Sequence, residues 1–162
     1  MGMIGHYLRT SSENMEHLKS EELDLYAFLD TLDESEQLDI DKTWQAIQFT
    51  LTGTTGETDE TAEKPWGNLV IGNDYIIPYE FPLSFISAKE VKEIAEAMKT
   101  MDEAEFRKIF DFKKMVSINI YPLVYGEDEE EFFDYVYGYF AEMRKFFFEA
   151  AAMGLAVAFY ID

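Results

Sequence analysis

The chain has 162 residues, of which 48% are hydrophobic and 16% aromatic, so it is long and apolar enough to bury a core within one domain. It contains no cysteine, which excludes disulfides, thiolate metal sites and cysteine nucleophiles. Thirteen Lys and Arg residues stand against 33 Asp and Glu residues, and the formal charge of -20 argues against nucleic-acid binding and membrane docking.

The N-terminal region begins with an expected strand, followed by two helical stretches. Side chains of Met3–Thr10 alternate between two faces, which predicts a strand. Ser11 or Ser12 is placed to cap a short helix, and a second helical stretch is expected from about Glu21 to Leu32.

The next segment has the pattern of a capped amphipathic helix. We expect Asp39 to be its N-cap, Asp41 to lie in the first turn, and Gly53 to end it in a left-handed conformation. Four apolar residues share one face, which must be buried: Ile40, Trp44, Ile47 and Leu51. Trp66, in contrast, is expected to be exposed.

The charged residues of this segment allow two interpretations. In the structural one, Asp39 and Asp41 serve the helix start, Lys42 is solvated and Trp44 is core. In the functional one, Lys42 and the two carboxylates face a pocket whose wall is the Trp44 indole.

The middle of the chain is expected to contain a mobile loop, short strands and two capped helices. Thr54–Thr61 is small and polar, and no Gly-Lys-Ser/Thr follows its glycines as in a phosphate loop. Residues Asn68 to Ile86 predict short strands and turns. Ser87 with Glu90 forms a capping box, and Asp102 repeats such a cap further on.

A long helix is predicted from about Asp128 to Met153, with two apolar faces. One narrow arc is polar: Glu131, Asp134, Gly138, Glu142, Lys145 and Glu149. We expect Phe133, Phe140 and Phe148, on the second apolar face, to be mostly buried. A central helix accounts for this face better than a dimer interface, although both a monomer and a homodimer remain open.

After Gly154, residues Leu155–Ile161 are apolar on both sides and predict an interior strand. The expected fold is α+β, with a small sheet that includes the N- and C-terminal strands and several helices packed on it. Residues 1–162 form one domain in this prediction.

Several blocks occur in an order that resembles the YfbM-like family, which is bacterial and known only as a domain of unknown function (number 1877). They are the opening MGMIG, the LDIDKTWQAIQFTLTG block, the SAKEVKEIAEAM helix, the IYP triplet and the closing aliphatic strand. The resemblance implies a single α+β domain and brings no catalytic residue or ligand. Where the family pattern has Tyr-Gly-Pro and then arginine, this chain has Glu80-Phe81-Pro82-Leu83-Ser84, so Ser84 supplies no cation for an anion.

Signatures of catalysis and metal binding are absent from the sequence. Only His6 and His17 are available, without H-E-x-x-H, and the acidic runs lack calcium-loop spacing. No serine lies in a nucleophile elbow, and with 33 acids some carboxylate pair will have any required separation by chance. We therefore assign no catalytic residue, metal or cofactor.

Two tyrosines around a proline form the remaining candidate site. Tyr121 and Tyr125 would line a small cleft with Trp44 and His6. The alternative is that Pro122 sets a turn and both rings are buried.

The acidic residues are concentrated in two runs. Residues Ser20 to Asp41 include nine acids and no Lys or Arg, and Glu127–Glu131 form a second run. Our first hypothesis is a non-enzymatic binding protein whose acidic face, including Glu129, Glu130 and Glu131, binds a basic protein, as an inhibitor or immunity protein does. The alternative is a small-molecule binding protein or enzyme with a pocket near Trp44 and Tyr121.

The sequence also bears on location. Met1–Thr10 has no basic region followed by a long apolar run, and no apolar stretch reaches the ~18 residues that cross a bilayer. We expect a cytoplasmic protein.

Overall fold

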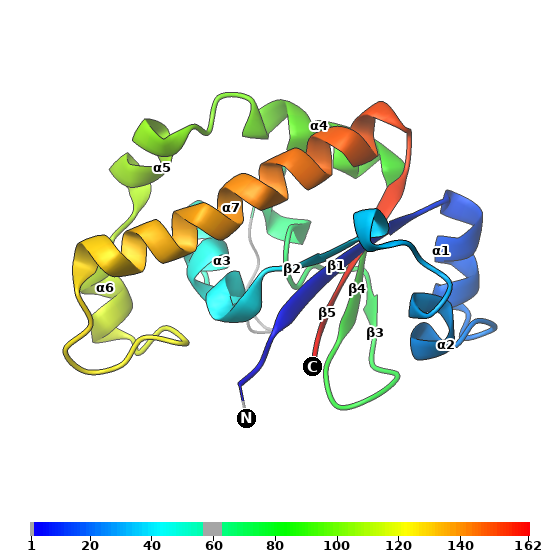
Figure 1. The fold of residues 1–162 in the computed structure, drawn as a ribbon, viewed down its shortest axis with the longest axis horizontal. Coiled ribbons are helices and arrows are strands. Elements are labelled where there is room, and N and C mark those ends of the chain that lie inside the picture. Colours follow the sequence, from blue (N-terminus) through cyan, green and yellow to red (C-terminus); the bar gives the residue numbers. More distant parts are fainter. Residues whose placement is uncertain (1, 57–62) are drawn as a thin grey trace.

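The computed structural model describes residues 2–56 and 63–162 of one α+β chain. Its centre is a five-stranded antiparallel sheet in the order β2-β1-β5-β4-β3, with helices on both faces (Figure 1). The N- and C-terminal strands both belong to this sheet, as predicted, and the structure pairs them as neighbours.

The last strand, β5 (Ala156–Ile161), is the middle strand of the sheet. It pairs with β1 (Gly5–Thr10) on one side and β4 (Leu83–Ile86) on the other, and all its residues are buried. This confirms the interior strand expected from its apolar pattern. The edges are β2 (Gln37–Asp39), which the sequence analysis missed, and β3 (Tyr75–Ile76).

One face of the sheet carries the larger core and most of the helices. These helices are α3 (Trp44–Thr52), α4 (Ala88–Met98), α5 (Glu103–Ile109), α6 (Phe112–Ser117) and α7 (Glu129–Ala152). In Figure 1, α7 runs across this face for much of the length of the molecule. Inward side chains such as Tyr7 and Phe159 join the sheet to it.

The other face carries a smaller core beneath α1 (Ser12–Lys19) and α2 (Leu25–Leu29). The predicted helix from Glu21 to Leu32 is therefore wrong in extent. Glu21 has a left-handed φ of 57°, and the Asp24 side chain caps α2 by accepting the N–H of Ala27 at 3.0 Å. A single 3₁₀ turn, Glu34–Glu36, leads from there into β2.

The predicted caps form as expected on three of the helices. Ser11 accepts the N–H of Asn14 at the start of α1, Ser87 and Glu90 form the capping box of α4, and Asp102 caps α5. The predicted polar arc of α7 is exposed throughout.

The second apolar face of α7 is covered within the chain. Phe133 and Phe140 are buried against Phe106 of α5, whose ring centroid lies 4.6 Å from that of Phe140. Phe148 is less completely buried than these two rings, because it lies at the edge between α7 and α4 with the Arg144 guanidinium over its ring.

The start of the Trp44 segment differs from prediction. Asp39 ends β2 instead of capping a helix, and a 3₁₀ turn, Asp41–Thr43, precedes α3. Trp44 is buried and Gly53 ends α3 with a φ of 73°, both as expected, whereas Leu51 is half-buried. Trp66, in the 3₁₀ turn Trp66–Asn68, was expected to be exposed but is half-buried against the larger core.

The predicted mobile loop Thr54–Thr61 lies largely outside the described residues, because 57–62 are not described. Within the parts of the chain that are described, no helix has the length and apolar character needed to cross a membrane.

Candidate functional site

The predicted site around Trp44 holds the N-terminal segment. The indole Nε1 of Trp44 donates to the carbonyl of Met3 at 3.1 Å, and the hydroxyl of Tyr121 accepts the N–H of Met3 at 2.8 Å. The two rings lie 5.9 Å apart, centroid to centroid, and Gln45 accepts the backbone N–H of Tyr121 at 2.7 Å. Trp44 and Tyr121 are thus brought together, but their hydrogen bonds hold the N-terminal segment of the same chain.

Asp39, Asp41 and Lys42 also meet local partners. Asp39 accepts the N–H of Asp41 at 2.6 Å, which supports the left-handed φ of 48° at Asp41. Asp41 in turn accepts the hydroxyl of Tyr135 at 2.7 Å; burial, and then this bond, raise the pKa of Tyr135. A Cβ added at Gly2 would lie 2.3 Å from Cε of Lys42, so Lys42 lies directly against the N-terminal segment.

Tyr125 and His6 do not join this cluster. Tyr125 is fully exposed and lines a separate hollow with Phe112 and Val124. His6 points to the other face of the sheet, where its ring stacks on Tyr160 at 5.0 Å. Among the described residues, no ring contact or hydrogen bond links either side chain to Trp44.

The acidic residues Glu129–Glu131 form the first turn of α7, where the helix dipole favours negative charge. Both carboxylate oxygens of Glu130 accept hydrogen bonds from Nη1 of Arg107, at 2.9 and 3.1 Å. The Arg107 guanidinium also lies 3.7 Å from the Phe133 ring centroid. Figure 1 places this end of α7 and the α1–α2 region at opposite ends of the molecule. The Ser20–Asp41 run spans this distance: its α2 part lies far from the first turn of α7 (Figure 1), whereas Asp41 hydrogen-bonds to Tyr135, one turn of α7 beyond Glu131.

A different site lies on the face of the sheet that α1 and α2 cover. Two adjoining hollows share Leu25, Pro78, Tyr79 and Leu83 in their walls, and we call them together the α2–β5 cleft. The first hollow has a volume of about 230 Å³ and the second of about 300 Å³. The loop between β3 and β4 separates them.

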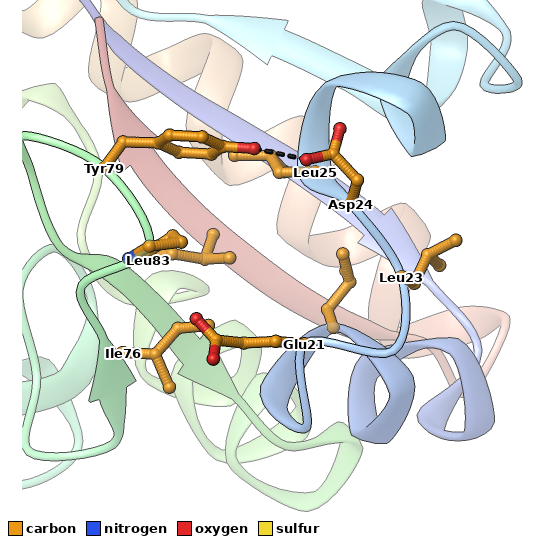
Figure 2. Close-up of a pocket in the computed structure, with 9 residues that line it drawn as sticks. Glu21, Leu23, Asp24, Leu25, Ile76, Tyr79 and Leu83 are labelled. Atoms are coloured by element: carbon orange, nitrogen blue, oxygen red, sulfur yellow. Dashed lines mark hydrogen bonds between the residues drawn. The ribbon is translucent and has the colours of Figure 1, made fainter.

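The first hollow combines an apolar floor with carboxylates (Figure 2). Leu25 and Leu83 contribute to the floor, and the carboxylates of Glu21 and Asp24 lie on different sides of it. The hydroxyl of Tyr79 donates a hydrogen bond to Asp24, which ties the β3–β4 loop to the start of α2. Asp24 thus caps a helix and orients a ring at the same time.

The second hollow is lined by aromatic rings and further carboxylates. Tyr26, Tyr79 and Tyr160 come from α2, the β3–β4 loop and β5, and Glu80 and Asp162 add negative charge. The rings of Tyr26 and Tyr79 lie 5.0 Å apart with their planes at 51°.

The electrostatics of the cleft are uniformly negative. Neither hollow is lined by Lys, Arg or His, and among the described residues Glu21 and Glu80 have no ion-pair partner. The hydrogen bond from Tyr79 lowers the pKa of Asp24, and the same bond raises the pKa of Tyr79. Burial, followed by the charge of Asp162, raises the pKa of Tyr160, so these phenols stay neutral beside ionised carboxylates.

This cleft was not predicted from the sequence. Its one pointer was the Glu80–Ser84 departure, since Glu80 and Leu83 line the cleft whereas Ser84 is buried and pairs with Phe159. No sequence spacing links Tyr26, Tyr79 and Tyr160. In the described ranges 2–56 and 63–162, no group of three His, Asp or Glu side chains is arranged to hold a metal ion.

Comparison with known proteins places this architecture in context. The family described as "Domain of unknown function (DUF1877)" matches residues 1–160. Protein YfbM of Escherichia coli (strain K12) is 32% identical over 134 residues, which cover 81% of this chain and 80% of the relative. The crystal structure of YfbM from Escherichia coli, titled as a protein of unknown function, superposes with a TM-score of 0.75 at 25% identity, covering 98% of this chain and 99% of that one.

Proposed function

The chain belongs to the DUF1877 family, and from that premise we propose that it is a non-enzymatic binding protein whose α2–β5 cleft takes a cationic group of a basic protein partner. In this proposal the protein acts in the cytoplasm, in the manner of an inhibitor or an immunity protein. Cell fractionation of the source organism tests the location.

One observation carries the proposal. The α2–β5 cleft brings together four carboxylates, those of Glu21, Asp24, Glu80 and Asp162, with tyrosine rings, and the part of the chain that the structure describes adds no basic side chain to its lining. Carboxylates attract a cation at long range, and aromatic faces attract it at contact. The apolar floor of the cleft suits the methylene stem of a lysine or arginine side chain.

The rest of the molecule favours a fast encounter with such a partner. The formal charge of -20 steers basic proteins toward the surface, and two acids of the segment Ser20–Asp41, Glu21 and Asp24, line the cleft. The first turn of α7 offers a second acidic surface at the other end, so the location of docking has to be measured.

Carbodiimide cross-linking in a lysate of the source cells tests the proposal, because this reagent joins carboxylates directly to lysine amines. Mass spectrometry of the cross-linked peptides should place partner lysines on Glu21 and Glu80. The yield should fall when the NaCl concentration rises from about 20 to 500 mM, because salt screens charges beyond a few ångströms.

Two double variants serve as the matched pair. Glu21→Gln with Glu80→Gln should abolish the cross-links at the cleft, whereas Glu129→Gln with Glu131→Gln should leave them unchanged. Cross-links confined to Glu129–Glu131, or a yield that ignores both salt and the cleft variant, would contradict docking at the α2–β5 cleft.

A further inference from the structure

We infer that the second hollow of the α2–β5 cleft is a binding site for a methylated ammonium group, held among the rings of Tyr26, Tyr79 and Tyr160. This inference rests on the proposed function only in that both place a cation in the same cleft. It adds the chemical class of that cation.

The three rings approach the hollow from three separate elements. Tyr26 belongs to α2, Tyr79 to the β3–β4 loop and Tyr160 to β5, and all three line the hollow. The rings of Tyr26 and Tyr79 are in contact and tilted by 51°, so they are not stacked face to face. Aromatic faces arranged in this way attract a cation through their quadrupoles, and quaternary ammonium groups are the ligands that aromatic cages recognise best.

Two contacts hold the rings in place. The hydrogen bond from Tyr79 to Asp24 fixes an otherwise exposed ring at the wall that both hollows share. The His6 ring stacks on Tyr160 with an interplanar angle of 18°, which supports the third wall. Such preorganisation lowers the entropy lost on binding.

The hydrogen-bonding groups of this hollow favour a cation without N–H donors. One oxygen of Asp162 already contacts Nε2 of His6 at 2.9 Å, and the Tyr79 hydroxyl donates to Asp24. Glu80 and the second oxygen of Asp162 are therefore the carboxylate acceptors left in this hollow among the described residues, fewer than the five N–H groups of a guanidinium. A primary ammonium or guanidinium loses several water contacts on entry and needs an acceptor for each N–H group. A methylated ammonium needs only negative charge and apolar or aromatic walls, and a hollow of about 300 Å³ is at the small end of ligand sites.

NMR titration of the full-length, isotope-labelled protein with choline tests the inference. Its neutral isostere, 3,3-dimethylbutan-1-ol, has the same shape without the charge. Choline should shift the resonances of Tyr26, Tyr79 and Tyr160 and bind about tenfold more tightly than the neutral alcohol, because only choline gains the cation–π attraction. Equal binding of the two compounds, or shifts confined to another surface, would overturn the inference.

Variants of the tyrosine rings distinguish cation binding by the aromatic rings from attraction by the negative charge of the whole protein. Tyr26→Leu should weaken choline binding about tenfold, whereas Tyr26→Phe, which keeps the ring, should bind choline as the parent does. Tyr125→Leu is the matched control, because Tyr125 is exposed and lies outside the cleft. If Tyr26→Leu keeps the parent's affinity and an unchanged amide spectrum elsewhere, the cage does not bind the cation.

Titration with peptides shows whether the ammonium group arrives on a protein or as a small solute. A short peptide with trimethyllysine that binds more tightly than choline would mean that the group arrives on a protein, and the reverse order would mean a small solute. A peptide with unmodified lysine that binds as tightly as the trimethylated one would overturn the cage while leaving the proposed basic partner standing. If choline binds but no partner cross-links form at Glu21 and Glu80, the ammonium site is supported and the proposed basic protein partner is contradicted.

Discussion

At the scale of single residues, one carboxylate in this protein links several elements. Glu90 accepts hydrogen bonds from the backbone and hydroxyl of Ser87, both at 2.9 Å, and from the amide of Asn68 at 2.8 Å. Burial raises the pKa of Glu90, but the hydrogen bonds from Ser87 and Asn68 outweigh it, and its pKa lies below the ordinary value. The charged form is therefore the one that the fold stabilises.

This lowered pKa predicts a pH-dependent contribution to stability. A group whose pKa is lower in the folded state stabilises the fold above its unfolded pKa of about 4.3, and the contribution disappears as the pH falls through the folded value. We expect Glu90→Gln to reduce the free energy of unfolding by about 1 kcal/mol at pH 7, and by less at pH 3. Urea denaturation at both pH values measures this.

Glu93→Gln on the same helix is the control, since Glu93 reaches only Lys89, at 4.0 Å, on the exposed side. It should change stability little at either pH. A loss for Glu90→Gln that is the same at pH 3 and pH 7 would assign the effect to packing instead of ionisation.

At the scale of elements, α7 organises the larger core through its aromatic residues. Phe140 is completely buried and stacks on Phe106 of α5, with the ring planes at 23°. Phe148, two turns further along α7, is half-buried beside α4 and carries the Arg144 guanidinium 5.7 Å from its ring centroid. Two phenylalanines of one helix face thus differ in how much water they exclude.

Truncation of these rings should show the difference. Phe140→Ala should lower the free energy of unfolding by about 3–5 kcal/mol, because it leaves a cavity in a packed core. Phe148→Ala should cost less than half as much, because water already reaches its site. Chemical denaturation of the two variants measures both costs, and equal losses would show that the edge between α7 and α4 is as tightly closed as the core.

At the scale of the whole molecule, charge is the dominant property. The formal charge of -20 on 162 residues opposes compaction, and acidic side chains occur both around α2 and in the first turn of α7, at opposite ends of the molecule (Figure 1). Several ion pairs offset part of this repulsion, such as Arg9 with Glu149 at 2.8 Å and Arg107 with Glu130 at 2.9 Å.

Salt should therefore stabilise the protein. Screening lengths fall from about 30 Å at 0.01 M to below 8 Å in high salt, so net repulsion weakens more than the close, partly buried ion pairs do. We expect the melting temperature to rise by several degrees between about 10 and 500 mM NaCl, as measured by differential scanning calorimetry. KCl should act in the same way, and a melting temperature that falls in both salts would show that the ion pairs outweigh the repulsion.

The elements with strong local signals were predictable from the sequence. The caps at Ser11, Ser87 and Asp102 act within one helical turn, and the apolar run of β5 needs burial on both sides wherever the sheet lies. Weakly patterned segments were harder, because β2 spans only Gln37–Asp39 and α2 only Leu25–Leu29.

The candidate site was decided by tertiary structure alone. Trp44 and Tyr121 were expected to meet and do so, but only the fold shows that both side chains hydrogen-bond to the backbone of Met3. Tyr26, Tyr79 and Tyr160 come together because the loop after β3 packs on α2 and both lie over the end of β5. Contacts of this kind depend on how distant elements pack, and such packing leaves no periodic pattern in the residues that make it.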